Sequence, residues 1–407
     1  MTERKGAKDM PVFQRADILI PRSELLAKWP VIACDQFTSQ PEYWLRTAET
    51  VGSAPSAFHI VLPEAELGKN DDERIRAIDR TMAEYLAGGV FRRFPNCYVY
   101  VERTLRSGAV RRGVVGVVDL DAYDYHDDAK TPIRATERTV VERIPPRVGI
   151  RSGAPIESSH VLLLCADQKR SLIEEIDRGE KLYDLDLMQG GGHLSGWLVN
   201  GAEADRFDER LGAYTAAAED GFCFAVGDGN HSLAAAKTCW EKLKEQDPAL
   251  VGSDHSARWA MVELENLFDP AQQFEPIHRI VRGVDPARLL AALGKRCARE
   301  GTPVLWYTRE GGGVLRFGKD AFPPEALQGM LDDYLAEEGG SIDFIHGEDV
   351  ALRLAREEGA VAFLMPRIEK DGLFRTISQN GVLPRKTFSM GHAEEKRYYL
   401  ECRKILP

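Results

Sequence analysis

Long apolar runs, targeting segments and paired cysteines are all missing from this chain. No apolar stretch approaches the roughly 18 residues that a membrane-spanning helix needs. The opening segment MTERKGAKDM is polar and lacks the apolar core of a signal peptide. The seven cysteines are scattered and none belongs to a C-x-x-C pair, so buried, reduced thiols explain them best. These absences predict a cytoplasmic protein that makes no contact with a membrane.

Three catalytic signatures are absent as well. The sequence has no G-x-x-x-x-G-K-[ST] of a P-loop, no H-E-x-x-H zinc motif and no G-x-S-x-G elbow of a serine hydrolase. Positive charge is also scarce, because 53 lysines and arginines stand against 64 acidic residues, for a net charge of −11. An acidic chain is a poor binder of nucleic acid, so we expect no nucleic-acid partner.

The length and composition predict a globular protein of several lobes. The chain has 407 residues, of which 43% are hydrophobic and 29% charged. Strand and helix patterns follow one another throughout, which predicts a mixed α/β (α+β) fold. We expect a disordered tail (1–10), an N-terminal lobe with a β-rich region (11–210), a strand–glycine turn–helix core packing with that lobe (211–284), and a C-terminal α/β lobe (285–407).

Apolar periodicity places the individual elements. We expect strands at 16–21, 58–63, 97–104, 111–123, 160–167, 221–226 and 257–267, and helices at 71–91, 169–179 and 232–246. In the C-terminal lobe we expect a helix at 285–301, strands at 303–308 and 313–317, and a strand–helix–strand unit at 341–366.

The segment GDGNHS (227–232) is the strongest candidate for a site. Its glycines let the backbone turn sharply and approach a ligand, and the N–H groups of a helix start favour an anion. Asn230 or Ser232 is a candidate helix cap. Asp228 would repel a bare phosphate, so it predicts a metal bridge or a base for a hydroxyl, and His231 is a candidate for contacting phosphate or moving protons. The alternative is a capped turn whose Asp and His satisfy only local hydrogen bonds.

Two further segments could contribute to a site. IRATERTVVERIPPRVGIR (133–151) is a local surplus of arginine in an acidic chain, and guanidinium groups suit phosphate and carboxylate. Glu137 within it is a candidate base or metal ligand. A solvated, salt-bridged face is the alternative interpretation. In GGGHLSGW (190–197), three glycines before His193 permit close ligand approach or a mobile lid, with a plain flexible turn as the alternative.

Six segments together resemble one family over nearly the whole chain. They are CDQFTSQPEYW (34–44), IRATERTVVERIPPR (133–147), LYDLDLMQGGGHLSGW (182–197), VGDGNHSLAAAK (226–237), FEPIHRIV (274–281) and LPRKTFSMG (383–391). On these segments the chain resembles the domain of unknown function 1015 family. Its members commonly carry a D-G-H-H-R-Y-type sequence at the glycine turn. Here Asn230 replaces the first His and Ser232 the Arg, so Lys237 or an arginine of 134–147 would have to substitute in holding phosphate.

A more distant likeness is to the partition-protein-B-like fold, which includes free-serine kinases. It implies a partition-protein-B-like core with a β-rich inserted region, and a glycine turn that binds ATP or ADP with Mg²⁺. The cofactor-binding residues would be Gly227, Gly229, Asn230, Ser232 and Lys237, with the metal at Asp228. The likeness also implies a catalytic carboxylate from another segment, for which the candidates are Glu137, Asp35 and Glu142, in that order.

The sequence therefore predicts a nucleotide-dependent phosphotransferase, a small-molecule kinase with a serine-like hydroxylated acceptor. The catalytic residues would be Asp228, His231 and Glu137, and the acceptor would contact Arg134, Arg138, Arg147 and His193. A nucleotide-binding switch without turnover and a metal-assisted phosphatase or hydrolase of a phosphorylated metabolite are the alternatives. The direction of transfer and the formation of a homodimer stay open, as does whether the stretch 383–400 closes over the site or forms a dimer contact.

Overall fold

The computed structural model describes residues 11–38, 40–319, 321–367, 369–384 and 386–405, so the tail expected at 1–10 lies outside the described residues. The chain divides into two compact units. The first contains the chain up to Gln272, then Ser378–Val382 and the residues from His392 onward, and the second contains Gln273–Ile377 and Leu383–Gly391. The lobe expected at 285–407 is thus shared between the two units. Within the described ranges, none of the helices combines the length and apolar character that crossing a membrane requires.

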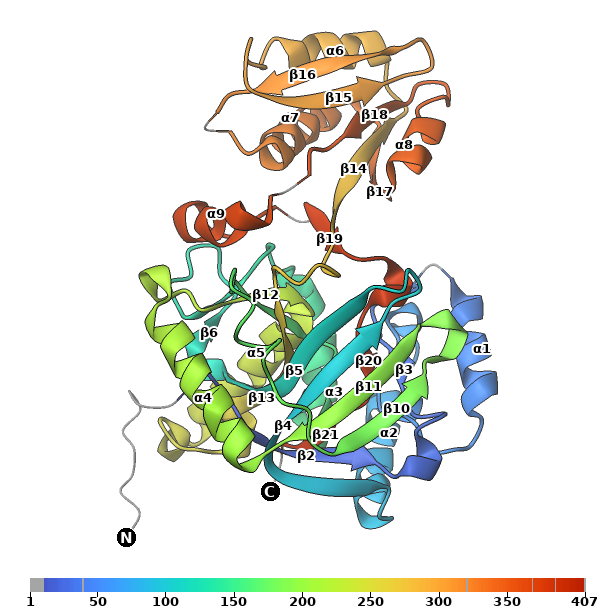
Figure 1. Ribbon diagram of the computed structural model, residues 1–407. Helices are drawn as coiled ribbons and strands as arrows, with labels where there is room; N and C mark the ends of the chain where they lie inside the picture. The colour runs from blue at the N-terminus through green and yellow to red at the C-terminus, as the bar shows by residue number, and fades with distance from the viewer. Residues whose placement is uncertain (1–10, 39, 320, 368, 385, 406–407) are drawn as a thin grey trace. The chain divides into compact units, whose positions relative to one another are not determined.

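A mixed sheet, of thirteen strands among the described residues, organises the first unit (Figure 1). Its order is β6-β7-β12-β9-β13-β5-β4-β2-β21-β8, with β1 beside β5 and the β10–β11 hairpin beside β4. The strands are β1 (Phe13–Gln14), β2 (Ala16–Pro21), β4 (Phe91–Thr104), β5 (Val110–Asp119), β6 (Tyr123–Asp124), β7 (Ile133–Ala135), β8 (Ile156–Ser158), β9 (Leu162–Cys165), β10 (Lys181–Asp186), β11 (His193–Val199), β12 (Phe224–Asp228), β13 (Trp259–Asn266) and β21 (Cys402–Lys404). A separate ladder pairs β3 (Val31–Ile32) with β20 (Tyr398–Tyr399).

Five α-helices lie wholly within the described part of the first unit: α1 (Pro41–Val51), α2 (Asp71–Ala87), α3 (Ile144–Ser152), α4 (Gly201–Ala216) and α5 (Asn230–Gln246). Helix α5 is apolar on two sides. Leu233 and Trp240 join the core of the sheet, whereas Ala234 and Ala235 pack against Ile144 of α3. Since both sides of α5 are packed, the start of this helix has a fixed place at the end of β12.

The second unit has its own sheet, in the order β16-β15-β18-β14-β17, with β19 beside β14. Its strands are β14 (Phe274–Arg282), β15 (Thr302–Tyr307), β16 (Gly312–Phe317), β17 (Ser341–His346), β18 (Val361–Leu364) and β19 (Phe388–Met390). Val281 packs with α6 (Pro286–Gly294) and α7 (Pro323–Glu338) on one face. The preceding residue, Ile280, packs with α8 (Glu348–Leu354) on the opposite face, because successive side chains of a strand point to opposite faces of the sheet. Helix α9 spans Leu373–Asn380, with its residues up to Ile377 in the second unit and those from Ser378 in the first.

The mixed α/β class predicted from the sequence is confirmed, but two predicted elements are wrong. Residues 169–179 form no helix, because the Asp167 carboxylate accepts hydrogen bonds from the backbone N–H groups of Lys169, Ser171 and Leu172. Such side-chain bonds compete with helical ones. The strand expected at 58–63 is a 3-10 turn (Ala57–His59) followed by irregular chain, and Ser56 caps that turn by accepting from Phe58 N–H.

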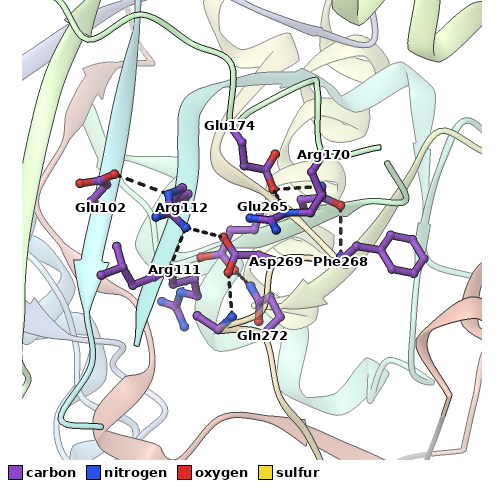
Figure 2. A network of polar contacts seen from close by, with 12 residues as sticks. Glu102, Arg111, Arg112, Arg170, Glu174, Glu265, Phe268, Asp269 and Gln272 are labelled. Atoms are coloured by element: carbon purple, nitrogen blue, oxygen red, sulfur yellow. Dashed lines mark hydrogen bonds and ion pairs between the residues drawn. The ribbon is translucent and has the colours of Figure 1, made fainter. Parts of the chain in front are cut away.

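Charged side chains are buried inside the first unit at strand β13. Glu265 is fully buried, with its Oε1 atom 2.8 Å from Arg111 Nε, and Gln272 donates to its other oxygen (Figure 2). Beside it, Arg112 lies 3.6 Å from Asp269. Burial and the charge of Glu263 raise the pKa of Glu265 to about 8, although Arg111 opposes the change. The native state therefore binds a proton at Glu265 that the unfolded chain releases at lower pH.

This raised pKa predicts a pH dependence of stability. Proton binding at Glu265 contributes its full stabilisation of the fold below pH 4.5, the pKa of this group in the unfolded chain. This stabilisation is lost as the pH rises towards 8. When the pH is raised from 5 to 8.5, the free energy of unfolding should therefore fall less in Glu265→Gln than in the parent. The two losses should differ by at least about 1.4 kcal/mol, which corresponds to a tenfold change in proton affinity. Urea denaturation at both pH values measures this difference. Glu209→Gln, at an exposed position of α4, is the control, and equal losses in the parent and Glu265→Gln would contradict the prediction.

Candidate functional site

The glycine turn joins β12 to α5. The strand ends at Asp228 and the helix begins at Asn230, so Gly229 makes the turn (Figure 1). Gly229 has a φ of +79°, and a Cβ atom there would lie 2.9 Å from the Cα atom of Val161. Both the backbone conformation and the lack of space require glycine. The strand–glycine turn–helix order predicted from the sequence is confirmed.

Gly229→Ala should lower the free energy of unfolding by about 1–3 kcal/mol, because alanine at positive φ is strained and its methyl group meets Val161. Gly212→Ala is the matched control. Gly212 lies within α4 and an added Cβ meets nothing within 4 Å, so this variant should gain roughly 0.5–1 kcal/mol. Chemical denaturation measures the change in unfolding free energy of both variants relative to the parent. Changes of the same sign in the two variants would contradict the prediction.

The start of α5 is not capped by a side chain. Gly229 occupies the N-cap position, so the expectation that Asn230 or Ser232 caps the helix is wrong. The N–H groups of Ser232 and Leu233 both donate to Gly229 O at 3.0 Å, and these are the first hydrogen bonds of the helix. The buried Oδ1 atom of Asn230 has no hydrogen-bond partner among the described residues. A helix start is suited to an anion, whereas the Asn230 oxygen, which is an acceptor, is suited to a hydrogen-bond donor.

Asp228 and Lys396 form an ion pair at the turn. Asp228 Oδ1 accepts from Gly229 N–H at 2.8 Å, and Oδ2 lies 3.1 Å from Lys396 Nζ. Lys396 directly follows the 3-10 turn Ala393–Glu395 near the end of the chain, and only 9% of its surface is exposed. A carboxylate and an ammonium group therefore meet at an uncapped helix start.

His160 connects this pair to other groups. It follows β8, is buried, and its Nδ1 lies 2.7 Å from Tyr399 Oη, while its Nε2 lies 3.5 Å from Ser232 Oγ. Burial lowers the pKa of His160, against the charges of Asp35 and Asp228.

Asp35, the second carboxylate candidate, belongs to the same electrostatic environment. Burial alone would raise its pKa, but the charge of His160, a hydrogen bond from Gln36 and the charge of Lys396 together lower it. Its carboxylate is therefore ionised at neutral pH. The neighbouring thiol of Cys34 is not, because burial raises its pKa to about 12.

The segment containing Glu137 is fastened to the glycine turn at both ends. Thr136 Oγ1 donates to Val226 O at 2.7 Å, and Val140 N–H donates to His231 Nε2 at 3.2 Å. Glu137 lies between these two anchors and is half-buried. One function of His231 is therefore to hold this segment against the start of α5. The third carboxylate candidate, Glu142, is exposed.

The structure does not gather the predicted arginines at one point. Arg134 is buried, donates to Thr131 O at 2.9 Å and lies 4.4 Å from the centre of the Phe222 ring, which precedes β12 at the opposite end from the turn. Arg138 is exposed and pairs with Asp127 at 3.0 Å.

Lys237 and His193 also have partners of their own. Lys237 pairs with Glu241 along α5 at 2.6 Å. His193 belongs to the β10–β11 hairpin, where Asp186 and Asp184 lie 2.8 and 2.9 Å from its ring nitrogens. Hydrogen bonds to these two carboxylates raise the pKa of His193.

Arg147 faces a cavity of about 130 Å³ beside the start of α5. It lies on α3 and pairs with Glu64 at 3.1 Å. The polar residues lining the cavity include Cys34, Glu64, Arg147, His160, Ser232 and Tyr399. In the ranges the structure describes, no three His, Cys, Asp or Glu residues are grouped as they would be around a metal ion.

Sequence reasoning missed His160, Lys396 and Tyr399 as site residues. His160 was included only in a buried strand, and the two others belong to a C-terminal stretch dense in charge and aromatics. That density was the only signal available. The contacts of Lys396 with Asp228 and of Tyr399 with His160 bring part of the stretch 383–400 to the glycine turn.

The fold and site define a mixed α/β protein with a polar site at a strand–glycine turn–helix junction. The chain belongs to a family described as a protein of unknown function (DUF1015), whose model matches residues 16–405. No curated protein matches the chain.

Several solved structures are distantly similar. C-terminally truncated SbnI from Staphylococcus aureus has a TM-score of 0.37 and 10% identity, covering 68% of this chain and 82% of that chain. A conserved hypothetical protein from Pyrococcus furiosus has a TM-score of 0.34 and 11% identity, covering 70% and 90%. A free serine kinase in complex with AMP has a TM-score of 0.39 and 13% identity, covering 71% and 91%. At these TM-scores the likenesses carry no argument about this chain.

Proposed function

We propose that this chain is a nucleotide-dependent phosphotransferase that acts on a small hydroxylated acceptor at the glycine turn. The observation that carries the proposal is the uncapped start of α5 beside the ion pair of Asp228 and Lys396. A helix start offers unsatisfied N–H groups and the positive end of the helix dipole to a phosphate. Lys396 supplies a positive charge beside the turn, where this chain has Ser232 in place of the arginine that is common in the family.

Lys396 and Asp228 would exchange partners when a nucleotide binds. Lys396 would turn to a phosphate oxygen, and Asp228 would hold Mg²⁺ together with phosphate oxygens and water. Mg²⁺ is commonly bound by one or two carboxylates plus substrate phosphates, so one carboxylate at this position is sufficient. Gly227 and Gly229 allow the phosphates to approach the backbone.

The acceptor side of the proposal involves a carboxylate base and an arginine. The acceptor oxygen would form a bond to the γ-phosphorus, and the bond from phosphorus to the nucleoside diphosphate would break, with the electron pair leaving on the diphosphate. The hydroxyl proton would pass to a carboxylate. Glu137 is the candidate anchored beside the turn, and Asp35 is the candidate held ionised by its neighbours. Arg147 would hold a carboxyl group of the acceptor.

Thermal shift with nucleotides tests the proposal first. ATP or ADP with Mg²⁺ at about 100 times its dissociation constant should add roughly 2.7 kcal/mol of stability, and less without Mg²⁺. Lys396→Met should reduce the shift, whereas Lys237→Met, which removes a lysine paired within α5, should leave it nearly unchanged. No shift with any nucleotide would remove the proposal. A shift without product in an assay with labelled nucleotide would leave a binding switch in its place.

A further inference from the structure

The cavity beside α5 is mainly apolar. Its volume is about 130 Å³, and its wall is formed by α3, α5, strand β8 and the chain around residues 60–67 of the first unit. Aliphatic side chains from all four segments contribute, including Leu62, Leu67, Ile150, Ile156 and Ala235. A wall of this kind gives little to a polar ligand but stabilises a buried hydrocarbon group.

Polar groups at the cavity connect it to the glycine turn. His160 and Ser232 line it, and the same His160 lies in the field of Asp228, while Ser232 is the third residue of α5. The ion pair of Arg147 and Glu64 also lines it, and their side chains are only 12% and 16% exposed. The cavity therefore combines an aliphatic wall with an arginine and lies next to the proposed phosphate site.

We propose that this cavity binds the aliphatic body of the phosphoryl acceptor, which makes the acceptor a small hydroxy acid of about five or six carbon atoms. The inference rests on the proposed function and names its substrate class. The size follows from comparison, because an apolar cavity of about 150 Å³ holds benzene. The carboxylate lies at Arg147 and the hydroxyl group at His160 and Ser232. Serine, with a single side-chain methylene, would leave most of the aliphatic wall without contact.

Titration calorimetry of the full chain without nucleotide tests this assignment. The probes are glycolate, lactate, 2-hydroxybutanoate, 2-hydroxyisocaproate and 2-hydroxyoctanoate, with serine for comparison. Affinity should rise about fourfold for each buried methylene up to 2-hydroxyisocaproate, and 2-hydroxyoctanoate should gain nothing further. Equal affinities along the series, or no binding of any member, would overturn the assignment.

Two variants that change the cavity volume in opposite directions separate binding from misfolding. Ala235→Val narrows the cavity and should move the best probe to a shorter acid, whereas Ile150→Ala widens it and should move the best probe to a longer one. A damaged fold would weaken every probe and could not move the optimum upward. Arg147→Met should weaken the acids tenfold or more but leave 3-methylbutanol, which lacks the carboxylate, unchanged.

The titration also separates the failure of this inference from the failure of the proposed function. Phosphoryl transfer to an acceptor whose affinity is independent of aliphatic size would overturn the cavity assignment alone. Size-dependent binding without transfer from any nucleotide would remove the phosphotransferase, and the cavity would stay assigned as the site of a small aliphatic acid.

Discussion

Replacing Arg397 by methionine should lower the free energy of unfolding by about 3–5 kcal/mol. The guanidinium group is buried, with its side chain 4% exposed, and lies 2.6 Å from Glu263 and 2.7 Å from Glu401. It also donates to the carbonyl oxygen of Ser159. Both carboxylates are at most 6% exposed, so the variant leaves two acidic groups buried without their shared cation.

Urea denaturation followed by tryptophan fluorescence measures this loss. Arg138→Met is the control, since Arg138 pairs with Asp127 on the surface and should contribute less than about 1 kcal/mol. Adding Glu263→Gln and Glu401→Gln to Arg397→Met should recover part of the stability, because the unpaired charges are then gone. The role given to Arg397 would be contradicted if Arg397→Met were as stable as the control, or if the triple variant had a lower free energy of unfolding than Arg397→Met alone.

Local sequence signals explain what could be predicted of the site. The apolar run before Gly227 and the periodic apolar residues after Ser232 predict a strand and a helix without knowledge of the rest of the chain. Two glycines between such elements indicate a tight turn. Every part of this reasoning uses residues within about twenty positions of one another, and the structure confirms the strand, the turn and the helix.

The partners of the turn could not be predicted because they come from distant parts of the chain. Lys396 reaches Asp228 because β20 and β21 return the end of the chain to the first unit. His160 is placed beside Ser232 by the pairing of β9 with β12. Pairings of this kind depend on sheet topology, which a single sequence does not contain.

The arginine-rich segment illustrates a different limit. A run of arginines between 134 and 151 predicts positive charge, but not the partner of each guanidinium group. The structure separates them, with Arg134 over the Phe222 ring, Arg138 on Asp127 and Arg147 on Glu64. Of these three, Arg147 lines the cavity beside α5, because it alone lies on the helix that packs against α5.

Asp228→Asn should lower the turnover rate by about 10²–10³-fold, the usual effect of removing one group that stabilises transition-state charge. The change is isosteric, and the remaining oxygen can still accept from Gly229 N–H, which lies 2.8 Å from Oδ1. The fold should therefore survive, with a melting temperature somewhat lowered because the buried Lys396 loses its charged partner. Asp205→Asn, at an exposed aspartate paired with Arg15, is the control and should keep full activity.

The double variant Asp228→Asn, Lys396→Met distinguishes catalysis from structure. If Asp228 only neutralises the buried Lys396, from which it lies 3.1 Å, removing both charges should restore activity. If Asp228 holds the metal of the nucleotide and Lys396 holds its phosphate, the double variant should be at least as inactive as the single one. Its nucleotide-induced thermal shift should also be lost. Because these two outcomes point in opposite directions, labelled-nucleotide turnover by the double variant decides whether the ion pair is part of the phosphate site or a feature of the turn alone.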